Sequence, residues 1–323
     1  MSLDTDVVMD RRLLRRKLTF WRVVAISAVI LAIAAAGWTV GRRTGLIPGL
    51  EHVARIEVKG VITQNAEVIR MIDRIRQNRY ARALVVTIDS PGGTVAGSEA
   101  LYQAIRSVAA VKPTVAVVEG QAVSGGYIAA IATDHIVSRE TSLTGSIGVI
   151  VQVPNVVRLL DHLGVRVDAV RSTPLKANPS GLEPTSPEAI AALREIVADS
   201  YTWFQRIVRE RRAMSEDEVR TASDGRVFAG NRALSMKLID TIGGETEART
   251  WLASRGVART LPIQRYRPSS TTPTSLIGTL AAPLLEAAGL TAFAERLRTT
   301  GVATQVELTA LDGLLAVWQP PSP

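Results

Sequence analysis

Two runs that are apolar except for one threonine each, and that are both followed by a helix-like pattern, constrain the fold of this chain more than any other feature. The runs are Ala83–Ile88 (ALVVTI) and Thr114–Val118 (TVAVV). A strand that is buried on both faces has such a sequence, because neither face tolerates polar side chains. Helical patterns follow, over Gly97–Ala109 and Gly126–Ala132. This alternation predicts an α/β fold with helices on both faces of a sheet.

The same periodicity predicts further elements on either side of these runs. Ala54–Val61 alternates apolar and polar residues, which is typical of a strand. Glu67–Arg79 has the apolar spacing of a helix, and Ala189–Arg212 reads as a long amphipathic helix. Ile136–Val137 and Val149–Val153 are further strand candidates.

A membrane segment is predicted near the amino terminus. Val23–Val40 contains eighteen residues without a charge, enough to extend about 27 Å as a helix and cross a bilayer core. Trp21 and Trp38 stand near its ends, where indoles prefer the headgroup region. A cleaved signal peptide is the alternative, and Ala34-Ala35-Ala36 offers small residues for a peptidase. The length of the run and of the tail before it favour an uncleaved anchor.

The distribution of charge agrees with a membrane protein and argues against a nucleic-acid-binding one. The chain carries 38 basic and 30 acidic residues, a net charge of +8. Residues 1–22 contribute +3 (six basic against three acidic side chains), and Arg42 and Arg43 add +2, which leaves +3 for residues 44–323. Nucleic-acid binding needs a basic stripe, which this distribution lacks. Basic residues before an apolar span stay in the cytoplasm, so the chain after it lies outside.

Cysteine and histidine usage limits the chemistry. With no cysteine, the chain has no disulfide, no thiolate metal site and no cysteine nucleophile. A multi-histidine metal centre would require nearly all of the three histidines, so the sequence does not favour one. We therefore expect no metal and no cofactor.

The predicted domain organisation has five parts. They are a basic cytoplasmic tail (1–22), the anchor (23–40), a linker (41–53), a catalytic domain (54–260) and a carboxyl-terminal extension (261–323). The extension begins with a Pro/Ser/Thr-rich linker around Pro268–Thr274. Two apolar-periodic stretches follow, Leu276–Leu290 and Leu308–Trp318, and are expected to form short helices.

Two glycine-rich segments follow the two buried strands. Asp89-Ser90-Pro91-Gly92-Gly93 could be a plain strand-to-helix turn, or a turn whose N–H groups converge on an anion. In Gly120–Tyr127 (GQAVSGGY), Ser124 stands at the expected helix start. It could be an ordinary N-cap, or a nucleophile whose developing oxyanion faces the Gly125 N–H.

A nucleophilic serine needs a base, and the histidines do not suggest one. His52 lies in the linker, His135 at the start of a strand, where it caps or packs, and His162 faces solvent on an amphipathic helix. A lysine is the other known partner, but it must be neutral, which burial favours.

Lys176 stands apart from the other four lysines. Lys17 is cytoplasmic, Lys59 lies on the first strand, Lys112 in a turn and Lys237 at a helix end. Lys176 lies in a non-helical segment, RSTPLKANPS, with a proline on either side; a solvated loop lysine is the alternative. Ser146, in Thr144–Gly148 (TGSIG), could supply a hydroxyl that orients a lysine amine.

Taken together, these segments resemble signal peptide peptidase A, the S49 serine peptidases, in its single-domain, membrane-anchored form. The resemblance covers roughly residues 54–255 and rests on five segments in order: IDSPGGTVAGSEAL, VEGQAVSGGYIAA, TSLTGSIGVI, the long helix through SYTWFQRIVRERRAMS, and DGRVFAGNRALSMKLIDTIGG. Two departures are visible. The family lysine usually follows an aromatic residue in a glycine-rich turn, whereas Lys176 sits in Pro-Leu-Lys-Ala, and Lys237 stands where glycine is common.

The resemblance implies a ClpP/crotonase-like fold and a serine–lysine dyad. It assigns Ser124 as nucleophile and Lys176 as base, with Ser146 orienting the lysine. The oxyanion would be held by the backbone N–H groups of Gly93 and Gly125. Small family members form rings of identical subunits in which serine and lysine come from adjacent copies.

The implied function is an endopeptidase that degrades cleaved signal peptides and other short hydrophobic peptides. The implied location is the inner membrane of a bacterial cell, with one span, a cytoplasmic amino terminus and an extracytoplasmic catalytic domain. Two alternatives are a crotonase-type acyl-CoA enzyme, disfavoured because CoA is cytosolic, and a non-catalytic membrane scaffold of the same fold.

Overall fold

The structure is a computed structural model that describes residues 20–28, 30–31, 50–268 and 315–317. The chain divides into two compact units, Met1–Glu51 and His52–Pro323. In the first unit, residues 20–28 and 30–31 are helical. Most of the predicted anchor, Val23–Val40, lies outside the described residues, and so do residues 1–19 of the basic tail. Within the described ranges, no helix combines the length and the apolar character that crossing a membrane requires.

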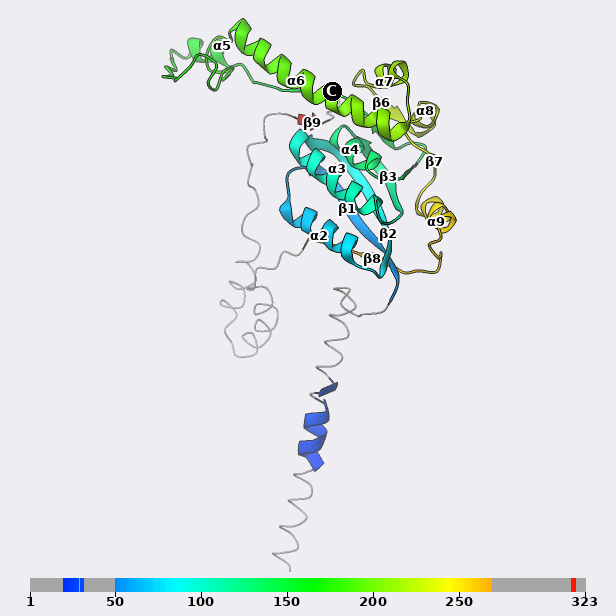
Figure 1. Ribbon diagram of the computed structural model, residues 1–323. Helices are drawn as coiled ribbons and strands as arrows, with labels where there is room; N and C mark the ends of the chain where they lie inside the picture. Colours follow the sequence, from blue (N-terminus) through cyan, green and yellow to red (C-terminus); the bar gives the residue numbers. More distant parts are fainter. Residues whose placement is uncertain (1–19, 29, 32–49, 269–314, 318–323) are drawn as a thin grey trace, which may run out of the picture. The chain divides into compact units, whose positions relative to one another are not determined.

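The second unit is built on one sheet, and its major strands run parallel, as Figure 1 shows. The strands are β1 (His52–Ile62), β2 (Ala81–Thr94), β3 (Thr114–Val123), β4 (His135–Ser138), β5 (Leu143–Gly145), β6 (Val227–Ala229), β7 (Thr241–Ile242), β8 (Ile263–Arg265) and β9 (Leu315–Val317). Their order is β6-β5-β3-β2-β1-β8; β4 pairs with β3 and β7, and β9 pairs with β2. The predicted α/β class is confirmed.

Helices connect the strands. They are α2 (Ala66–Gln77), α3 (Val95–Ala109), α4 (Gly125–Ile131), α5 (Val157–His162), α6 (Pro187–Arg212), α7 (Glu216–Ala222), α8 (Gly230–Ser235) and α9 (Glu245–Ser254). Local sequence explains their limits. The Ser186 side chain accepts a hydrogen bond from the Ala189 N–H at the start of α6, and Pro187 occupies its first turn. Ser215 and Glu218 form a capping box at the start of α7.

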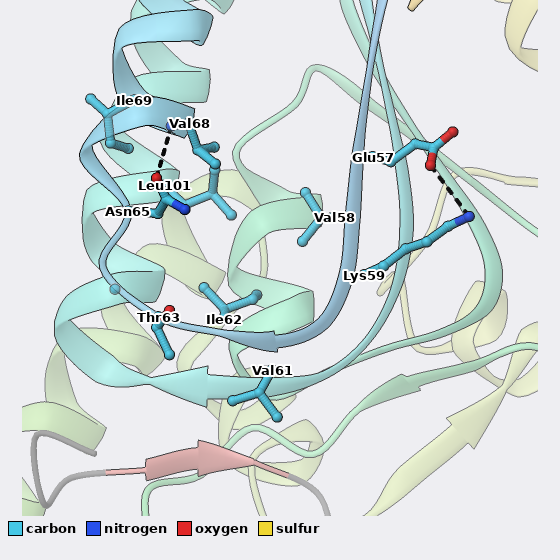
Figure 2. A pocket seen from close by; sticks show the side chains of 11 residues that line it. Glu57, Val58, Lys59, Val61, Ile62, Thr63, Asn65, Val68, Ile69 and Leu101 are labelled. Carbon is cyan, nitrogen blue, oxygen red and sulfur yellow. Dashed lines mark hydrogen bonds and ion pairs between the residues drawn. The ribbon is translucent and has the colours of Figure 1, made fainter. Parts of the chain in front are cut away.

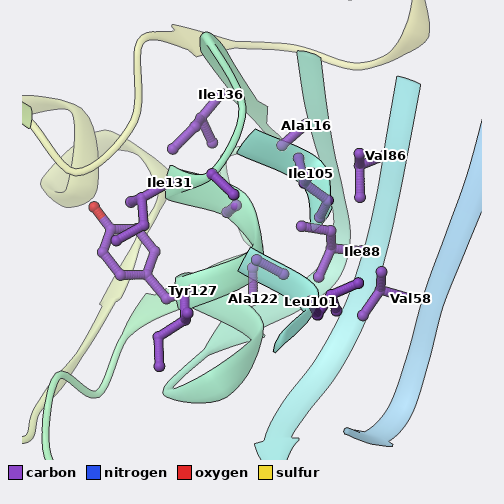
Figure 3. Close-up of a cluster of buried hydrophobic side chains, with 14 of the residues drawn as sticks. Val58, Val86, Ile88, Leu101, Ile105, Ala116, Ala122, Tyr127, Ile131 and Ile136 are labelled. Carbon is purple, nitrogen blue, oxygen red and sulfur yellow. The ribbon is translucent and has the colours of Figure 1, made fainter. Parts of the chain in front are cut away.

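The two faces of the sheet carry separate cores because side chains alternate along each strand. On β2, Leu84, Val86 and Ile88 belong to the larger core, which includes residues of α2, α3 and α4. Figure 3 shows this cluster around Ile105. Ala83 and Val85 face the other core, which includes side chains of α9. Complete burial of each such aliphatic side chain stabilises the fold by about 1.5–3 kcal/mol.

Helix α6 joins the core only through its second half. Phe204, Ile207 and Val208 are buried in the larger core. In the first half, Ile190 and Ile196 are 38% and 46% exposed. Figure 1 shows α5 and the beginning of α6 projecting beyond the helices that cover the sheet. The predicted apolar side of this helix is therefore fully packed only in its second half, since in the first half Ala189 is buried and Leu193 and Val197 are half-buried.

Strand β2 continues further than the sequence predicted. The segment Asp89–Gly93 is not a turn but the last part of the strand, which ends at Thr94. Gly92 and Gly93 pair with Val61 and Ile62 of β1. Pro91 follows a register shift between Ile88 and Ser90, where a missing N–H is tolerated.

Three other expectations are also wrong. Residues 149–153 form no regular strand: β5 ends at Gly145, and Ser146, with a φ of 49°, turns the chain out of the sheet. His52 is the first residue of β1 and does not belong to a linker. It is held in the domain because it is buried and its Nε2 lies 2.9 Å from the Tyr266 hydroxyl. In the predicted apolar helix Leu308–Trp318, the described residues Leu315–Val317 form a strand, because they pair with β2.

His135 packs against the edge of the second core, as its position at a strand start predicted. Its ring stacks on Trp251 at 4.9 Å, and its Nε2 lies 2.9 Å from the Thr241 hydroxyl. Burial lowers the pKa of His135; the Asp240 carboxylate opposes this, and the Arg212 guanidinium adds to it. The folded protein therefore prefers neutral His135.

This preference makes stability depend on pH. The unfolded chain binds the His135 proton more readily, so the contribution to stability is complete above the ordinary pKa of 6.5 and is lost as the pH falls below it toward the folded-state value. We expect the urea midpoint to drop between pH 7.5 and pH 5.5, and the drop to shrink in His135→Gln. His162 is exposed, so His162→Gln is the matched control and should keep the full drop. An unchanged pH dependence in His135→Gln would contradict this account.

Candidate active site

Ser124 lies at the junction between β3 and α4 in a strained backbone conformation. Its φ is 53° and its ψ is −118°, values that cost a residue with a side chain roughly 1–3 kcal/mol. Two sets of hydrogen bonds hold it there. The Ser124 N–H donates to the Gly145 carbonyl at 2.8 Å, and the Ser124 carbonyl accepts from the N–H groups of Tyr127 and Ile128 at 2.9 and 3.0 Å. These hydrogen bonds thus offset the strain of a backbone conformation that an ordinary helix start does not need.

The Ser124 side chain does not cap the helix that it precedes. It is 1% exposed and makes no capping hydrogen bond to α4. The N-cap interpretation is therefore wrong.

Two glycines shape the backbone after Ser124. Gly125 is the first residue of α4, and the first N–H groups of a helix have no acceptor within it. A Cβ on Gly126 would lie 2.7 Å from the Ser90 carbonyl oxygen, so a larger residue would force α4 away from β2. The glycines therefore bring an N–H group of the helix start and the neighbouring strand close to Ser124.

Ser146 is held in the position next to Ser124 by the sheet register. Val123 on β3 pairs with Gly145 on β5, so each serine directly follows one member of a matched pair. Ser146 also has a positive φ, 49°, and its N–H donates to the Arg226 carbonyl at 2.8 Å. Its side chain is 8% exposed. Two strained serines therefore stand side by side at the carboxyl ends of β3 and β5.

Gly93 lies on the strand that runs past this junction. Ser90 pairs with Ala122, and both chains continue in the same direction, β2 toward Gly92 and Gly93 and β3 toward Ser124. Beyond Ser90 the two strands no longer pair. The carboxyl ends of three strands therefore bring Ser124, Ser146, Gly125 and Gly93 to one region of the sheet edge.

Three of the described lysines are engaged elsewhere. The Lys59 ammonium is 3.4 Å from Glu57, and the Lys237 ammonium is 2.5 Å from Glu218. The Lys112 ammonium donates to the carbonyls of Ile75 and Asn78 at the end of α2, at 2.6 and 2.5 Å. Lys17 lies outside the described residues.

Lys176 lies in a turn between α5 and α6, and its side chain is exposed. Its backbone N–H donates to the Thr173 carbonyl at 3.1 Å. An ion pair between Arg171 and Glu183 fastens the ends of this segment, and it lowers the pKa of the Glu183 carboxyl. Within the described residues, no hydrogen bond or ion pair joins the Lys176 ammonium to Ser124 or Ser146. The structure of one chain therefore does not bring the lysine to the serines.

None of the three histidines lies at the carboxyl ends of the strands, where Ser124 is located. His52 and His135 begin parallel strands, at the edge of the sheet opposite to the carboxyl ends, and His162 is exposed on α5. Among the described residues, no three His, Cys, Asp or Glu side chains group as metal ligands. A histidine base for Ser124 is thus absent from the described part of the chain.

Comparison of the sequence with known proteins identifies the family of this chain. The family model of peptidase family S49 matches residues 106–258, and that of Clp protease matches residues 52–152. A protein of Synechocystis sp. named as a putative protease is 35% identical over 206 residues, which cover 63% of this chain and 74% of that protein. The chain belongs to peptidase family S49.

Other relatives agree with this assignment. A protein of Enterococcus faecium named as a putative signal peptide peptidase SppA is 26% identical over 235 residues, 68% of each chain. The chloroplastic serine protease SPPA of Arabidopsis thaliana is 29% identical over 259 residues, 77% of this chain but 36% of the plant protein. The chain is thus a serine peptidase, and its sheet belongs to the ClpP-like class.

In this S49 peptidase a small pocket opens beside the end of β1. Its volume is about 180 Å³, and it lies between β1, the start of α2 and α3 (Figure 2). Val58, Ile62 and Leu101 contribute apolar surface, and the Glu57–Lys59 ion pair is the charged part of the lining. Ile62 pairs with Gly93, so the pocket adjoins the strand that passes Ser124.

The pairing of β9 with β2 was not anticipated from the sequence. The available signal was the apolar run after Gly313 (LLAVW), which also suits a strand. Periodicity cannot distinguish a short apolar strand from a helix, and no local sequence feature indicates with which strand such a segment pairs.

Proposed function

We propose that this peptidase is a membrane-anchored endopeptidase with a Ser124–Lys176 dyad, which degrades cleaved signal peptides and other short hydrophobic peptides. The observation that carries the proposal is the strained, buried Ser124, whose hydroxyl does not cap α4 and which directly precedes Gly125, the first residue of that helix. Strain of this kind is maintained where a side chain must be aimed.

The proposed reaction follows from these positions. A peptide lies extended along the end of β2, and the Ser124 hydroxyl attacks its carbonyl carbon while its proton passes to the neutral Lys176 amine. The N–H groups of Gly93 and Gly125 stabilise the oxyanion. Lys176 then returns the proton to the leaving amine, and water releases the acyl group from Ser124. Ser146 accepts a hydrogen bond from the lysine amine and orients it.

The lysine comes from a neighbouring copy in this proposal. A lysine acts as a base only when it is neutral, and burial favours that form. Because Lys176 is exposed in one chain, a second copy has to cover it. Apolar side chains around it are exposed too, which suits an interface. They are Val165, Val167, Val170, Leu175 and Leu182. A homo-oligomer would bury these side chains and complete each site.

The hydrophobic substrate class is supported by the pocket beside β1. Its apolar lining from Val58, Ile62 and Leu101 suits an aliphatic side chain of a peptide. The Val23–Val40 segment would keep the enzyme at the membrane, where such peptides are produced. In this proposal the amino terminus is cytoplasmic and the catalytic domain lies outside the inner membrane of a bacterial cell.

A fluorophosphonate probe tests the nucleophile directly. The probe reacts with activated serines, so we expect a single labelled peptide containing Ser124 when the labelled protein is digested and mapped by mass spectrometry. Parallel digestion of hydrophobic and of charged model peptides tests the substrate class, with faster cleavage expected for the hydrophobic set. Labelling of another serine would refute the assignment.

Lys176→Arg is expected to be inactive. Arginine keeps the positive charge and the length of the side chain but cannot lose its proton near neutral pH, so it cannot serve as base. We expect peptide cleavage to fall by at least about 10³-fold, which is within the usual contribution of a general base. Lys237→Arg is the matched control, because Lys237 is an exposed lysine paired with Glu218. An active Lys176→Arg enzyme would direct the search to another base.

A further inference from the structure

The carboxyl-terminal segment of the chain lies on the strand that passes Ser124. Strand β9 (Leu315–Val317) pairs antiparallel with the end of β2: Val317 faces Gly92, Ala316 faces Gly93, and Leu315 faces Thr94. In Figure 2 it is the pink strand near Val61.

The edge that β9 occupies is the one next to Ser124. The other edge of Gly92 and Gly93 is taken by β1, through Val61 and Ile62. On the near side, β3 covers β2 only as far as the pair Ser90 and Ala122, after which the chain turns at Ser124. The free backbone groups of β2 beyond that point form an open edge, and an extended segment adds to such an edge by hydrogen bonds. β9 fills the position that an extended substrate needs to reach the serine.

We propose that Leu315–Val317 is a built-in competitor that occupies the peptide-binding edge of β2 until a substrate displaces it. This inference rests on the proposed function, since it regulates that same site. The segment Leu-Ala-Val carries no charge and resembles a short hydrophobic peptide. Tethering within one molecule gives a segment an effective concentration of about a millimolar, so weak pairing suffices for substantial occupancy. Three paired residues are few enough for a longer peptide to replace them.

The first test separates binding from catalysis in the kinetics. Leu315→Pro/Ala316→Pro removes two successive N–H groups, one of which must face β2 because successive N–H groups point to opposite edges. We expect the KM for a hydrophobic peptide to fall by about 2- to 10-fold with kcat unchanged, since only a competitor of the free enzyme is lost. A chain ending at Gly313 should behave alike. Val302→Pro/Ala303→Pro, the same change further up the chain, is the control and should leave KM as in the wild type.

The second test needs no cleavage, so it is independent of the proposed chemistry. A fluorescent peptide with the sequence of residues 313–319 (GLLAVWQ) is titrated into Ser124→Ala protein, full-length or ending at Gly313, and its anisotropy is recorded. We expect at least about 2-fold tighter binding to the shortened protein, in which the edge is open. Equal binding to both proteins, or an unchanged KM in the double-proline variant, would overturn the inference. If the wild type cleaves no peptide, the proposed function fails and the binding experiment alone decides.

Discussion

Replacement of Ser124 by alanine should reduce peptide cleavage by about 10⁴-fold or more, because a serine peptidase without its nucleophile retains only the residual effect of substrate binding and the oxyanion hole. The protein should remain folded. The Ser124 hydroxyl makes no capping bond, so its removal should cost less than the ~1 kcal/mol of a lost cap. Cleavage of a fluorogenic peptide measures the activity, and calorimetry measures the melting temperature.

Ser98→Ala is the matched control for this experiment. Ser98 is fully buried on α3, and its hydroxyl has no hydrogen-bond partner among the described residues, so alanine should be tolerated there. We expect activity and melting temperature close to those of the wild type. Wild-type cleavage by purified Ser124→Ala would mean that another group attacks the peptide.

A mixture of two inactive variants should regain activity if the dyad is shared between copies. Ser124→Ala keeps Lys176, and Lys176→Ala keeps Ser124. In a ring with one serine and one lysine meeting at each interface, random mixing of equal amounts places both intact residues at about a quarter of the interfaces. We therefore expect roughly a quarter of the wild-type rate after subunit exchange.

Two controls make the mixing experiment decisive. Each variant alone must stay inactive after the same treatment, and exchange must be shown separately, for example by energy transfer between differently labelled copies. If the subunits exchange and no activity returns, each chain forms its own dyad and the shared site is refuted.

The central sheet could be predicted from the sequence because burial on both faces leaves a plain signature. Ala83–Ile88 and Thr114–Val118 are apolar except for one threonine each, and both lie in strands. The end of β2 could not be predicted. Proline and glycine disfavour strands locally, and Pro91-Gly92-Gly93 is extended only because β1 and β9 pair with it from distant parts of the chain.

The candidate site was predictable in its positions but not in its conformations. The motif around Ser124 indicated a strand-to-helix junction, and the serine lies there. Its positive φ, and that of Ser146, depend on hydrogen bonds that the two serine N–H groups donate to the carbonyls of Gly145 and Arg226, which no local pattern reveals. The place of Lys176 relative to Ser124 stays a prediction, since in one chain the lysine is exposed and its surroundings would come from another copy.

The half-packed helix α6 has a mechanical consequence for catalysis. Phe204, its first residue in the larger core, lies roughly 25 Å along the helix axis from Pro187, at about 1.5 Å per residue. We therefore expect that the first half of α6, together with the Lys176 segment that precedes it, tilts more easily than the half packed from Phe204 onward. A tilt of about 10° would move the amino-terminal end of the helix by roughly 4 Å, more than the length of a hydrogen bond. In the proposed oligomer, proton transfer from Ser124 to Lys176 would therefore require a neighbouring copy to hold the amino-terminal end of α6 in place. The rate of peptide cleavage would then depend on how rigidly the copies are packed, and not only on whether they associate.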